Sequence, residues 1–511
     1  MAKNQIISLN GENLKISQVC EVVYAGSKIK LDAASLKKIE KSRKFVEDLV
    51  KKEAIVYGIT TGFGEFSSVP IKKQDAAQLQ KNLIMSHAAG CGESYEPQYI
   101  KSAMLLRVNA LAKGYSGVRA NTVQVLIDLI NNDIIPIVPI HGSVGSSGDL
   151  APLSHIVLAM MGMGEVIYKN ERMAAQKALK KAGVLPTELS YKEGLALING
   201  TQMMCGIGAL LAARARELYY LSCVTAALST EALMGTPRAF SALISKVRPH
   251  RGQVLTSRIM SGLLAGSPIA SSHSDCNEVQ DAYSLRCIPQ VHGTVYDAIS
   301  YVESVVDIEM NSATDNPLIF VEENEVISGG NFHGEPIAMA MDFLGIAVSE
   351  LASISERRAD RLVNPNNSHR TLPAFLIKDG GLNSGFMIAQ YTSAAIVSEN
   401  KVLAHPAVVD TIPTSANKED FNSMGSISAR KCIRIVENVE KVLAIELLLA
   451  CQGIDFRLPL KPAEKLKKIH SYVRKHITHM KEDRVLSEDI NRAIDIIKSP
   501  DFNSLIASIC K

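Results

Sequence analysis

Long helical stretches separated by short polar turns constrain the fold of this 511-residue chain more than any other feature. The clearest stretch runs from Arg430 to Leu449, and its apolar residues recur on one helical face: Cys432, Val436, Val439, Leu443 and Leu447. Other stretches rich in Ala, Leu, Ile, Met and Glu are predicted to be helical: 205–235, 295–312, 335–362 and 385–404. Helices of this length bury their apolar faces against one another, so we predict a mainly α-helical protein built on a long-helix bundle.

Strand signals are weak and local. The segment Ala54–Tyr57 is one candidate, and Leu318–Val321 is another, as part of a hairpin. The sequence shows no repeat period, no low-complexity tract and no linker rich in Pro, Gly or Ser.

Composition excludes several classes of protein. Hydrophobic residues make up 47% and charged residues 21%, which is ordinary for a globular protein and excludes disorder. A total of 55 Lys and Arg against 52 Asp and Glu leaves a net charge of +3. This near balance provides no electrostatic surface for nucleic acid or an anionic membrane, so we expect neither as a partner.

The nine cysteines are scattered and form no Cys-x-x-Cys pair, which argues against a disulfide framework or a zinc ribbon. The start of the sequence has no apolar segment of the kind that directs secretion. The segment Gly194–Ala213 is uncharged over most of its length, but its polar residues and glycines favour a core helix over a membrane span. We therefore expect a soluble cytoplasmic protein.

The helix-breaking residues gather in short turns beside helical stretches: Tyr57–Gly64, His141–Asp149, Asn199–Gln202, Ser328–His333 and Pro413–Asn417. Loops held by rigid helices commonly carry catalytic residues. The turns therefore indicate an enzyme.

The segment Ser146-Ser147-Gly148 directly precedes a predicted helix, with Asp149 as its N-cap and Pro152 in its first turn. Backbone N–H groups at such a position favour negative charge. Asp149 stands where a serine-hydrolase elbow needs glycine, and the Gly-Lys-Ser/Thr ending of a phosphate loop is missing. Taken alone, these residues favour an ordinary capped loop.

The stretch Gly142–His155 closely resembles the signature of the histidine and phenylalanine ammonia-lyase family. Further matches to this family recur in order along nearly the whole chain: Tyr57–Gly64, Ser86–Gly90, Asn199–Gln202, Gln280–Cys287, Asn311–Pro317, Ser328–His333 and Thr414–Asp420. The resemblance implies a fumarase/aspartase-like long-helix bundle over 206–511 and a smaller N-terminal head over 1–205. It also implies a homotetramer in which active sites combine residues from several subunits.

In this family an Ala-Ser-Gly tripeptide cyclises, with loss of two waters, to methylidene-imidazolone (MIO). The resemblance implies the same group from Ser146-Ser147-Gly148, with Ser146 in place of the usual alanine. The Gly148 nitrogen would attack the carbonyl carbon of residue 146, and Ser147 would lose its hydroxyl. Residue 146 contributes its carbonyl to the ring, so we expect cyclisation to occur with serine in place of alanine. No metal and no external cofactor is implied.

The remaining roles are carried over from the family residue by residue. Tyr57 resembles the base that removes the β-proton, and Arg286 the clamp on the substrate carboxylate. Asn199, Gln280 and Tyr283 resemble residues that position the ring or the carboxylate through hydrogen bonds. Phe332 resembles a residue packed against MIO. The resemblance implies that Tyr57 and Phe332 come from subunits neighbouring the one that holds Ser147.

Two positions favour histidine as the substrate. Histidine-specific members carry Ser-His at Ser86-His87, and they carry glutamate where Glu419 stands. A carboxylate can accept a hydrogen bond from imidazole, but it is costly to bury against an apolar phenyl ring. Four positions depart from the family pattern: Ala282, Ile288, Lys418 and Phe421. Of these, Lys418 is placed to pair with Glu419 and weaken its contact with imidazole.

The resemblance therefore implies deamination of L-histidine to trans-urocanate and ammonia, the first step of histidine degradation. One alternative is a tyrosine or phenylalanine ammonia-lyase, or an aminomutase, of the same family. The other is an inactive helical scaffold that never forms MIO. The twelve histidines include no His-Glu-x-x-His motif, and 461–484 is predicted to be an amphipathic helix, not a metal site.

Overall fold

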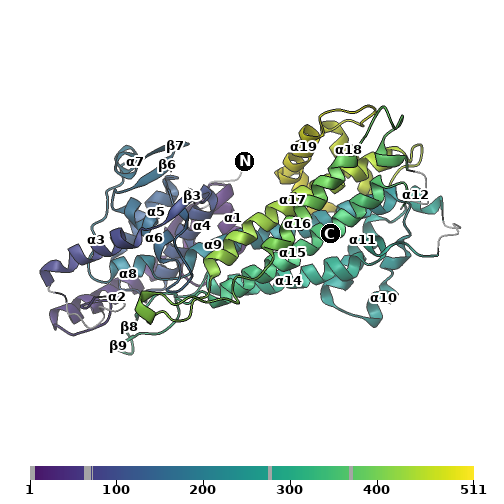
Figure 1. Ribbon diagram of the computed structural model, residues 1–511. Helices are drawn as coiled ribbons and strands as arrows, with labels where there is room; N and C mark the ends of the chain where they lie inside the picture. The colour runs from purple at the N-terminus through teal and green to yellow at the C-terminus, as the bar shows by residue number, and fades with distance from the viewer. Residues whose placement is uncertain (1–5, 63–70, 72, 274–278, 367–371, 511) are drawn as a thin grey trace. The chain divides into compact units, whose positions relative to one another are not determined.

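The computed structural model describes residues 6–62, 71, 73–273, 279–366 and 372–510. Cys276 and the end of the turn Tyr57–Gly64, from residue 63 on, lie outside these described residues. Helices dominate the described chain, and its strands are short (Figure 1). The prediction of a mainly α-helical protein is confirmed.

The chain packs into two compact units, each built from three separate segments. Unit 1 comprises Met1–Ala213, Val302–Asp342 and Pro406–Arg430. Unit 2 comprises Arg214–Tyr301, Phe343–His405 and Lys431–Lys511. The first segment of unit 1 ends near the predicted boundary at residue 205, but unit 1 also includes two later segments. The division into a head and a bundle stays a prediction.

Unit 1 holds the strands and the shorter helices of the first part of the chain. These helices are α1 (Ile16–Tyr24), α2 (Ala33–Lys51), α3 (Ala76–His87), α4 (Pro97–Ala112), α5 (Ala120–Asn131), α6 (Leu150–Met160), α7 (Ala175–Ala182) and α8 (Glu193–Ile198). The apolar side chains of Val46 and Val50 on α2 pack with Ile59 and Ile319 in a buried cluster.

The strands form small sheets. A parallel pair joins β1 (Ile6–Leu9) to β2 (Lys28–Leu31), with Ile6 opposite Lys28. The other pairs are antiparallel: β3 (Cys91–Ser94) with β5 (Pro139–His141), β6 (Glu165–Tyr168) between β4 (Ile135–Pro136) and β7 (Glu171–Ala174), and β8 (Leu318–Phe320) with β9 (Glu325–Ile327). The last pair confirms the hairpin predicted at Leu318.

The longest helices each contribute residues to both units: α9 (Gln202–Ala232), α14 (Ile288–Glu309), α15 (Glu335–Val363) and α17 (Gly425–Asp455). Together with α16 (Met387–Leu403) they confirm the predicted long helices. The apolar face predicted on α17 is buried, with Val439, Leu443 and Leu447 at 0% exposure. Apolar periodicity identified α17, whereas the other long helices were recognised from their richness in Ala, Leu, Ile, Met and Glu.

The other helices of unit 2 are shorter: α10 (Ala242–Val247), α11 (Arg251–Leu263), α12 (Pro268–Ser271), α13 (Tyr283–Arg286), α18 (Glu464–His476), α19 (Leu486–Lys498) and α20 (Pro500–Cys510). Within the described residues, α15 alone is long and apolar enough to cross a membrane by length and composition. Of its most apolar 18-residue window, 72% is buried inside the protein. A buried core helix passes the same test.

Two local predictions were wrong. The segment Ala54–Tyr57 is not a strand. Its backbone is irregular up to Val56 and a turn begins at Tyr57, because the Thr60 hydroxyl accepts from Val56 N at 2.9 Å and donates to Ala54 O at 2.7 Å. The helix predicted over 461–484 ends at His476, and Ile477 has an extended backbone with φ of −130°. The apolar residues beyond this end are still buried, so burial alone did not indicate where the helix stops.

Candidate active site

The tripeptide Ser146-Ser147-Gly148 lies in the loop between β5 and α6. Gly148 has a left-handed backbone with φ of +74°. A Cβ atom there would lie 2.1 Å from Gly200 O, closer than any real contact allows. Only glycine fits this position, because it has no Cβ and adopts positive φ without strain.

The tripeptide is attached to the turn between α8 and α9. Asp149 N donates to Gly200 O at 2.7 Å, and Gly200 N donates to Ser147 O at 3.3 Å. The side-chain amide of Asn199 also donates to Ser147 O, at 3.0 Å. Asn199, predicted to act near the tripeptide, therefore contacts it directly.

The Asp149 side chain does not have the predicted role. Asp149 is the residue at the N-cap of α6, but its side chain makes no cap hydrogen bond there. Its Oδ2 instead accepts from Met203 N at 2.9 Å and Met204 N at 3.0 Å, at the start of α9. Burial raises the pKa of Asp149 to about 7, although the Met204 N–H, the Ser426 hydroxyl and the Met203 N–H lower it.

Arg107, on α4, is a structural residue of the site that the sequence analysis missed. Its guanidinium is buried and donates to Ala196 O at 3.1 Å and to Asn199 O at 2.9 Å. These carbonyls end α8, where backbone acceptors lack helical partners. The signal for it in the sequence is an arginine between the apolar residues Leu106 and Val108 of a mostly buried helix.

Glu419 reaches the tripeptide from a distant part of the chain. Its Oε2 accepts from the Ser146 hydroxyl at 2.6 Å and from the Thr414 hydroxyl at 2.9 Å. Its Oε1 accepts from the Ser147 hydroxyl at 2.9 Å. Lys418 is exposed, and its N–H donates to Ser415 O at 3.0 Å within the turn that presents Glu419.

His87 ends α3 and is electrostatically coupled to Glu419. Desolvation by burial lowers the pKa of His87, while its hydrogen bond to Leu83 O and the charge of Glu419 raise it. His87 Nδ1 lies 2.9 Å from Leu83 O, which can only accept, so in neutral His87 the proton is on Nδ1. This leaves Nε2 as an acceptor.

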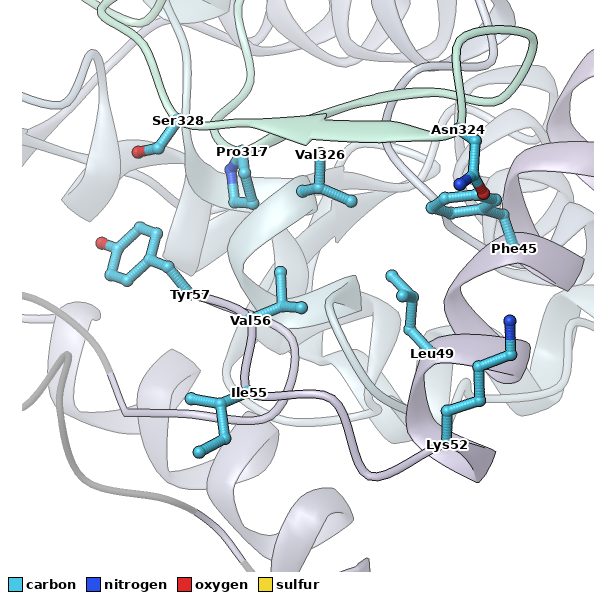
Figure 2. Close-up of a pocket in the computed structure, with 10 residues that line it drawn as sticks. All are labelled: Phe45, Leu49, Lys52, Ile55, Val56, Tyr57, Pro317, Asn324, Val326 and Ser328. Carbon is cyan, nitrogen blue, oxygen red and sulfur yellow. The ribbon is translucent and has the colours of Figure 1, made fainter.

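Tyr57 lines a cavity of about 430 Å³ in unit 1. Apolar side chains of α2 and of the β8–β9 hairpin form much of the wall. Figure 2 shows Tyr57 and Ser328 at one end of this cavity, and Phe45 and Asn324 at the other. The described contacts do not join Tyr57 to the tripeptide, and its role as a base stays a prediction.

Phe332 is half-buried in the turn between β9 and α15. The next residue, His333, makes structural hydrogen bonds beside this turn. His333 Nε2 donates to Phe421 O at 3.1 Å, and its Nδ1 accepts from Glu335 N at 3.3 Å. Phe332 itself stays a prediction as a residue packed against MIO.

Gln280, Tyr283 and Arg286 belong to unit 2. Gln280 is exposed, and the Arg286 guanidinium lies 4.5 Å from the centre of the Tyr283 ring. Arg286 Nε is buried and has no hydrogen-bond partner among the described residues. The cation is thus held by the aromatic face and retains a donor, as a carboxylate clamp requires.

A buried ion pair in unit 2 contacts α13, the helix that carries Tyr283 and Arg286. Arg358 donates to the carboxylate of Glu446 at 2.5 and 2.9 Å, and both side chains have no exposed surface. Arg358 also lies 3.4 Å from Ser284 O in α13. This pair is not apparent from the sequence, because its partners lie on different helices.

The family model named "Aromatic amino acid lyase" matches residues 14–475 of this chain. The chain belongs to this family. The predicted resemblance is therefore confirmed, and the chain is an ammonia-lyase, a carbon–nitrogen lyase.

Individual relatives agree with this assignment. The histidine ammonia-lyase of Natranaerobius thermophilus is 51% identical over 492 residues, which are 96% of this chain and 97% of the relative. The structure of histidine ammonia-lyase from Trypanosoma cruzi has a TM-score of 0.92 and 43% identity, and the match covers 99% of this chain and 96% of that one. Tyrosine aminomutase from Streptomyces globisporus has a TM-score of 0.93 and 36% identity, with 98% of both chains covered. The predicted long-helix fold is confirmed.

Aromatic amino acid lyases depend on MIO, and the residues of this loop fit that group. The tripeptide is present, and Gly148 lies so close to the backbone of Gly200 that no side chain fits at position 148. Asn199 Oδ1 is a buried oxygen with no hydrogen-bond partner among the described residues. No cluster of three or more metal-binding side chains occurs in the part of the chain that the structure describes.

Proposed function

We propose that this chain is a histidine ammonia-lyase that converts L-histidine to trans-urocanate and ammonia, the first step of histidine degradation. The observation that carries the proposal is the Glu419 carboxylate, which lies 2.9 Å from the Ser147 hydroxyl and is coupled to His87. A phenyl ring at this place would desolvate the carboxylate without a hydrogen bond, whereas imidazole supplies an N–H donor. The identity to named histidine ammonia-lyases supports the same substrate.

Ser146, Ser147 and Gly148 would form MIO by autocatalytic cyclisation. When present, this group supplies the electrophile that makes the amino group of the substrate a better leaving group. Asn199 would hold it through Ser147 O, and Phe332 would pack against it. The left-handed turn at Gly148 brings the reacting backbone segment into a tight conformation, which favours ring closure.

The other side chains would bind and orient the substrate and move one proton. Arg286 would pair with the substrate carboxylate, assisted by hydrogen bonds from Gln280 and Tyr283. His87 Nε2 and Glu419 would accept hydrogen bonds from the protonated groups of L-histidine. Tyr57 would remove the β-proton as a general base.

We further propose a homotetramer in which Tyr57 and Phe332 complete the site of a neighbouring subunit. The cavity beside Tyr57 supports this, because it is open space next to a proposed catalytic group. We place the reaction in the cytoplasm, where reducing conditions disfavour disulfides, and no disulfide occurs among the described cysteines.

Turnover of L-histidine, L-tyrosine and L-phenylalanine by purified protein tests the proposed substrate. We expect urocanate from L-histidine, detected by its ultraviolet absorption, to form much faster than the two other products. Preference for L-phenylalanine, or a β-amino acid as the product, would overturn the substrate assignment.

The mass of the intact protein tests MIO formation separately. We expect it to be two waters below the encoded mass, and Ser147→Ala to remove this deficit. Full encoded mass in the unsubstituted protein would indicate an inactive scaffold.

A further inference from the structure

We propose that Ser146 is a positioning residue, whose hydroxyl orients the substrate-binding carboxylate of Glu419. This inference rests on the proposed deamination of histidine. The sequence analysis assigned Ser146 only its backbone carbonyl, and the family usually has alanine there. The structure shows a use for the extra hydroxyl.

The two oxygens of Glu419 have different partners. Oε2 accepts from two hydroxyls, those of Ser146 at 2.6 Å and Thr414 at 2.9 Å. Oε1 accepts from the Ser147 hydroxyl at 2.9 Å. Ser146 is buried at 7% exposure, so water competes little for this contact.

Ring formation would remove one of these donors and leave the other two. The carbonyl oxygen of residue 146 leaves as water with the hydrogens of Gly148 N and Ser147 N. Ser147 Oγ–H leaves as the second water together with the α-hydrogen of Ser147. The hydroxyls of Ser146 and Thr414 take no part in either loss and remain on Oε2.

Loss of the Ser147 hydroxyl therefore leaves Oε1 as a free acceptor at the reacting position. The two hydroxyls on Oε2 keep the carboxylate from rotating, so Oε1 stays directed toward the substrate imidazole. With alanine at position 146, Thr414 alone would hold Oε2. The side chain of Ser146 thus pre-organises the contact that selects histidine.

The test compares Ser146→Ala with the unsubstituted enzyme. Ser154→Ala is the matched control, because Ser154 is a fully buried serine of α6 whose hydroxyl donates to Leu150 O and not to Glu419. Three kinds of measurement are made: intact mass, steady-state kinetics that give KM and kcat for L-histidine, and calorimetry that gives the Kd for trans-urocanate and for cinnamate. Cinnamate has a phenyl ring in place of imidazole.

We expect Ser146→Ala to keep the mass deficit of two waters. The KM for L-histidine and the Kd for urocanate should rise about tenfold, as for loss of one hydrogen bond to a charged group, with kcat changed less than about twofold. The Kd for cinnamate should not rise, and Ser154→Ala should leave the mass deficit, the kinetic constants and both Kd values unchanged.

Unchanged urocanate binding in Ser146→Ala would overturn the inference, as would equal weakening of urocanate and cinnamate. Full encoded mass would also overturn it, because Ser146 would then act in ring formation. Failure of the unsubstituted enzyme to deaminate L-histidine would overturn the proposed function instead, and the inference with it.

Thr414→Val provides a second route to the same conclusion. It removes the other donor to Oε2, so we expect Ser146→Ala and Thr414→Val together to weaken urocanate binding by more than the product of their separate effects. Strictly multiplicative effects would mean that the two hydroxyls do not share the task of holding Glu419, which contradicts the inference.

Discussion

The residues that present Glu419 have an uncommon backbone. Ser415, Ala416 and Asn417 all have positive φ, at 52°, 52° and 64°, although none is glycine. A left-handed residue with a Cβ atom costs about 1–2 kcal/mol. The turn is closed by Thr414 N donating to Glu419 O at 2.9 Å. Strain of this kind persists where the surrounding contacts over-determine the conformation, and here it places one carboxylate beside the tripeptide.

Glu419→Gln should weaken the use of L-histidine. The amide keeps the shape of the side chain but loses the charge, so we expect kcat/KM for L-histidine to fall about 10- to 100-fold. The neighbouring exposed carboxylate provides the control, and Asp420→Asn should change little. Steady-state kinetics measure both. If Glu419→Gln retained the full preference for L-histidine over L-phenylalanine, the assigned role of Glu419 would be wrong.

Gly148→Ala should prevent maturation. Its Cβ would lie 2.1 Å from Gly200 O, so the loop must move away from the turn that holds it. Gly183→Ala is a matched control, because Gly183 has a similar φ of +72° but no atom within 4 Å of its Cβ position. We expect intact mass to show the full encoded value for Gly148→Ala only. A deficit of two waters in Gly148→Ala would contradict this prediction.

At the scale of elements, Asp149 couples the tripeptide loop to α9. Its backbone begins α6, and its carboxylate caps the first turn of α9. The residue that follows the reactive tripeptide is therefore held by a 31-residue helix. The hydrogen bonds to that helix therefore restrict the motion of the loop.

The buried carboxyl of Asp149 predicts a pH dependence of stability. Its pKa of about 7 in the folded protein lies above the ordinary value of 3.8. Between these values the folded state keeps a proton that the unfolded chain has lost, so stability falls as the pH rises through this window. Asp149→Asn removes the titration. Denaturant unfolding at pH 5, 6, 7 and 8 should show a flatter profile for Asp149→Asn, and parallel profiles would contradict the prediction.

The ion pair of Arg358 and Glu446 should stabilise unit 2. Glu446 also accepts from Ser355 at 2.6 Å and from Ser229 at 2.7 Å, so its loss disturbs several buried donors. Glu446→Gln leaves the Arg358 charge buried without its partner, which should cost about 3–5 kcal/mol in the free energy of unfolding. Glu437→Gln, on the same helix but in a more exposed pair, is the control. Equal stability of these two variants in denaturant melts would refute the argument.

At the scale of the whole molecule, we propose that the active site combines residues from more than one chain. Tyr57 lines a cavity of unit 1. Sharing of residues among subunits would make activity depend on assembly.

Complementation between two inactive variants tests this sharing. Tyr57→Phe and Ser147→Ala should each be inactive alone, but subunits co-expressed at equal levels should recover about a quarter of the sites in mixed tetramers. Light scattering should confirm the tetramer, and co-expression of Tyr57→Phe with unsubstituted chains should serve as a control for mixing. No recovered activity in mixed tetramers would place Tyr57 and Ser147 in the same subunit's site.

The sequence by itself determined the long helices, the β8–β9 hairpin and the position of the tripeptide proposed to form MIO. Helices such as α17 repeat one local apolar pattern, and the motifs are short consecutive segments, so both can be recognised without knowing what packs against them. The irregular backbone from Ala54 and the early end of α18 were missed, because a hydroxyl contact decides the first and a local extended residue decides the second.

Only the tertiary structure decided which side chains meet at the site. The Ser146 hydroxyl and the Glu419 carboxylate are 273 residues apart, and the Asp149 carboxylate caps α9 and not its own helix. Hydrogen bonds act over about 3 Å and depend on where distant segments pack, which no local pattern encodes. The residue types of the site are therefore visible in the sequence, whereas their partners are a property of the fold.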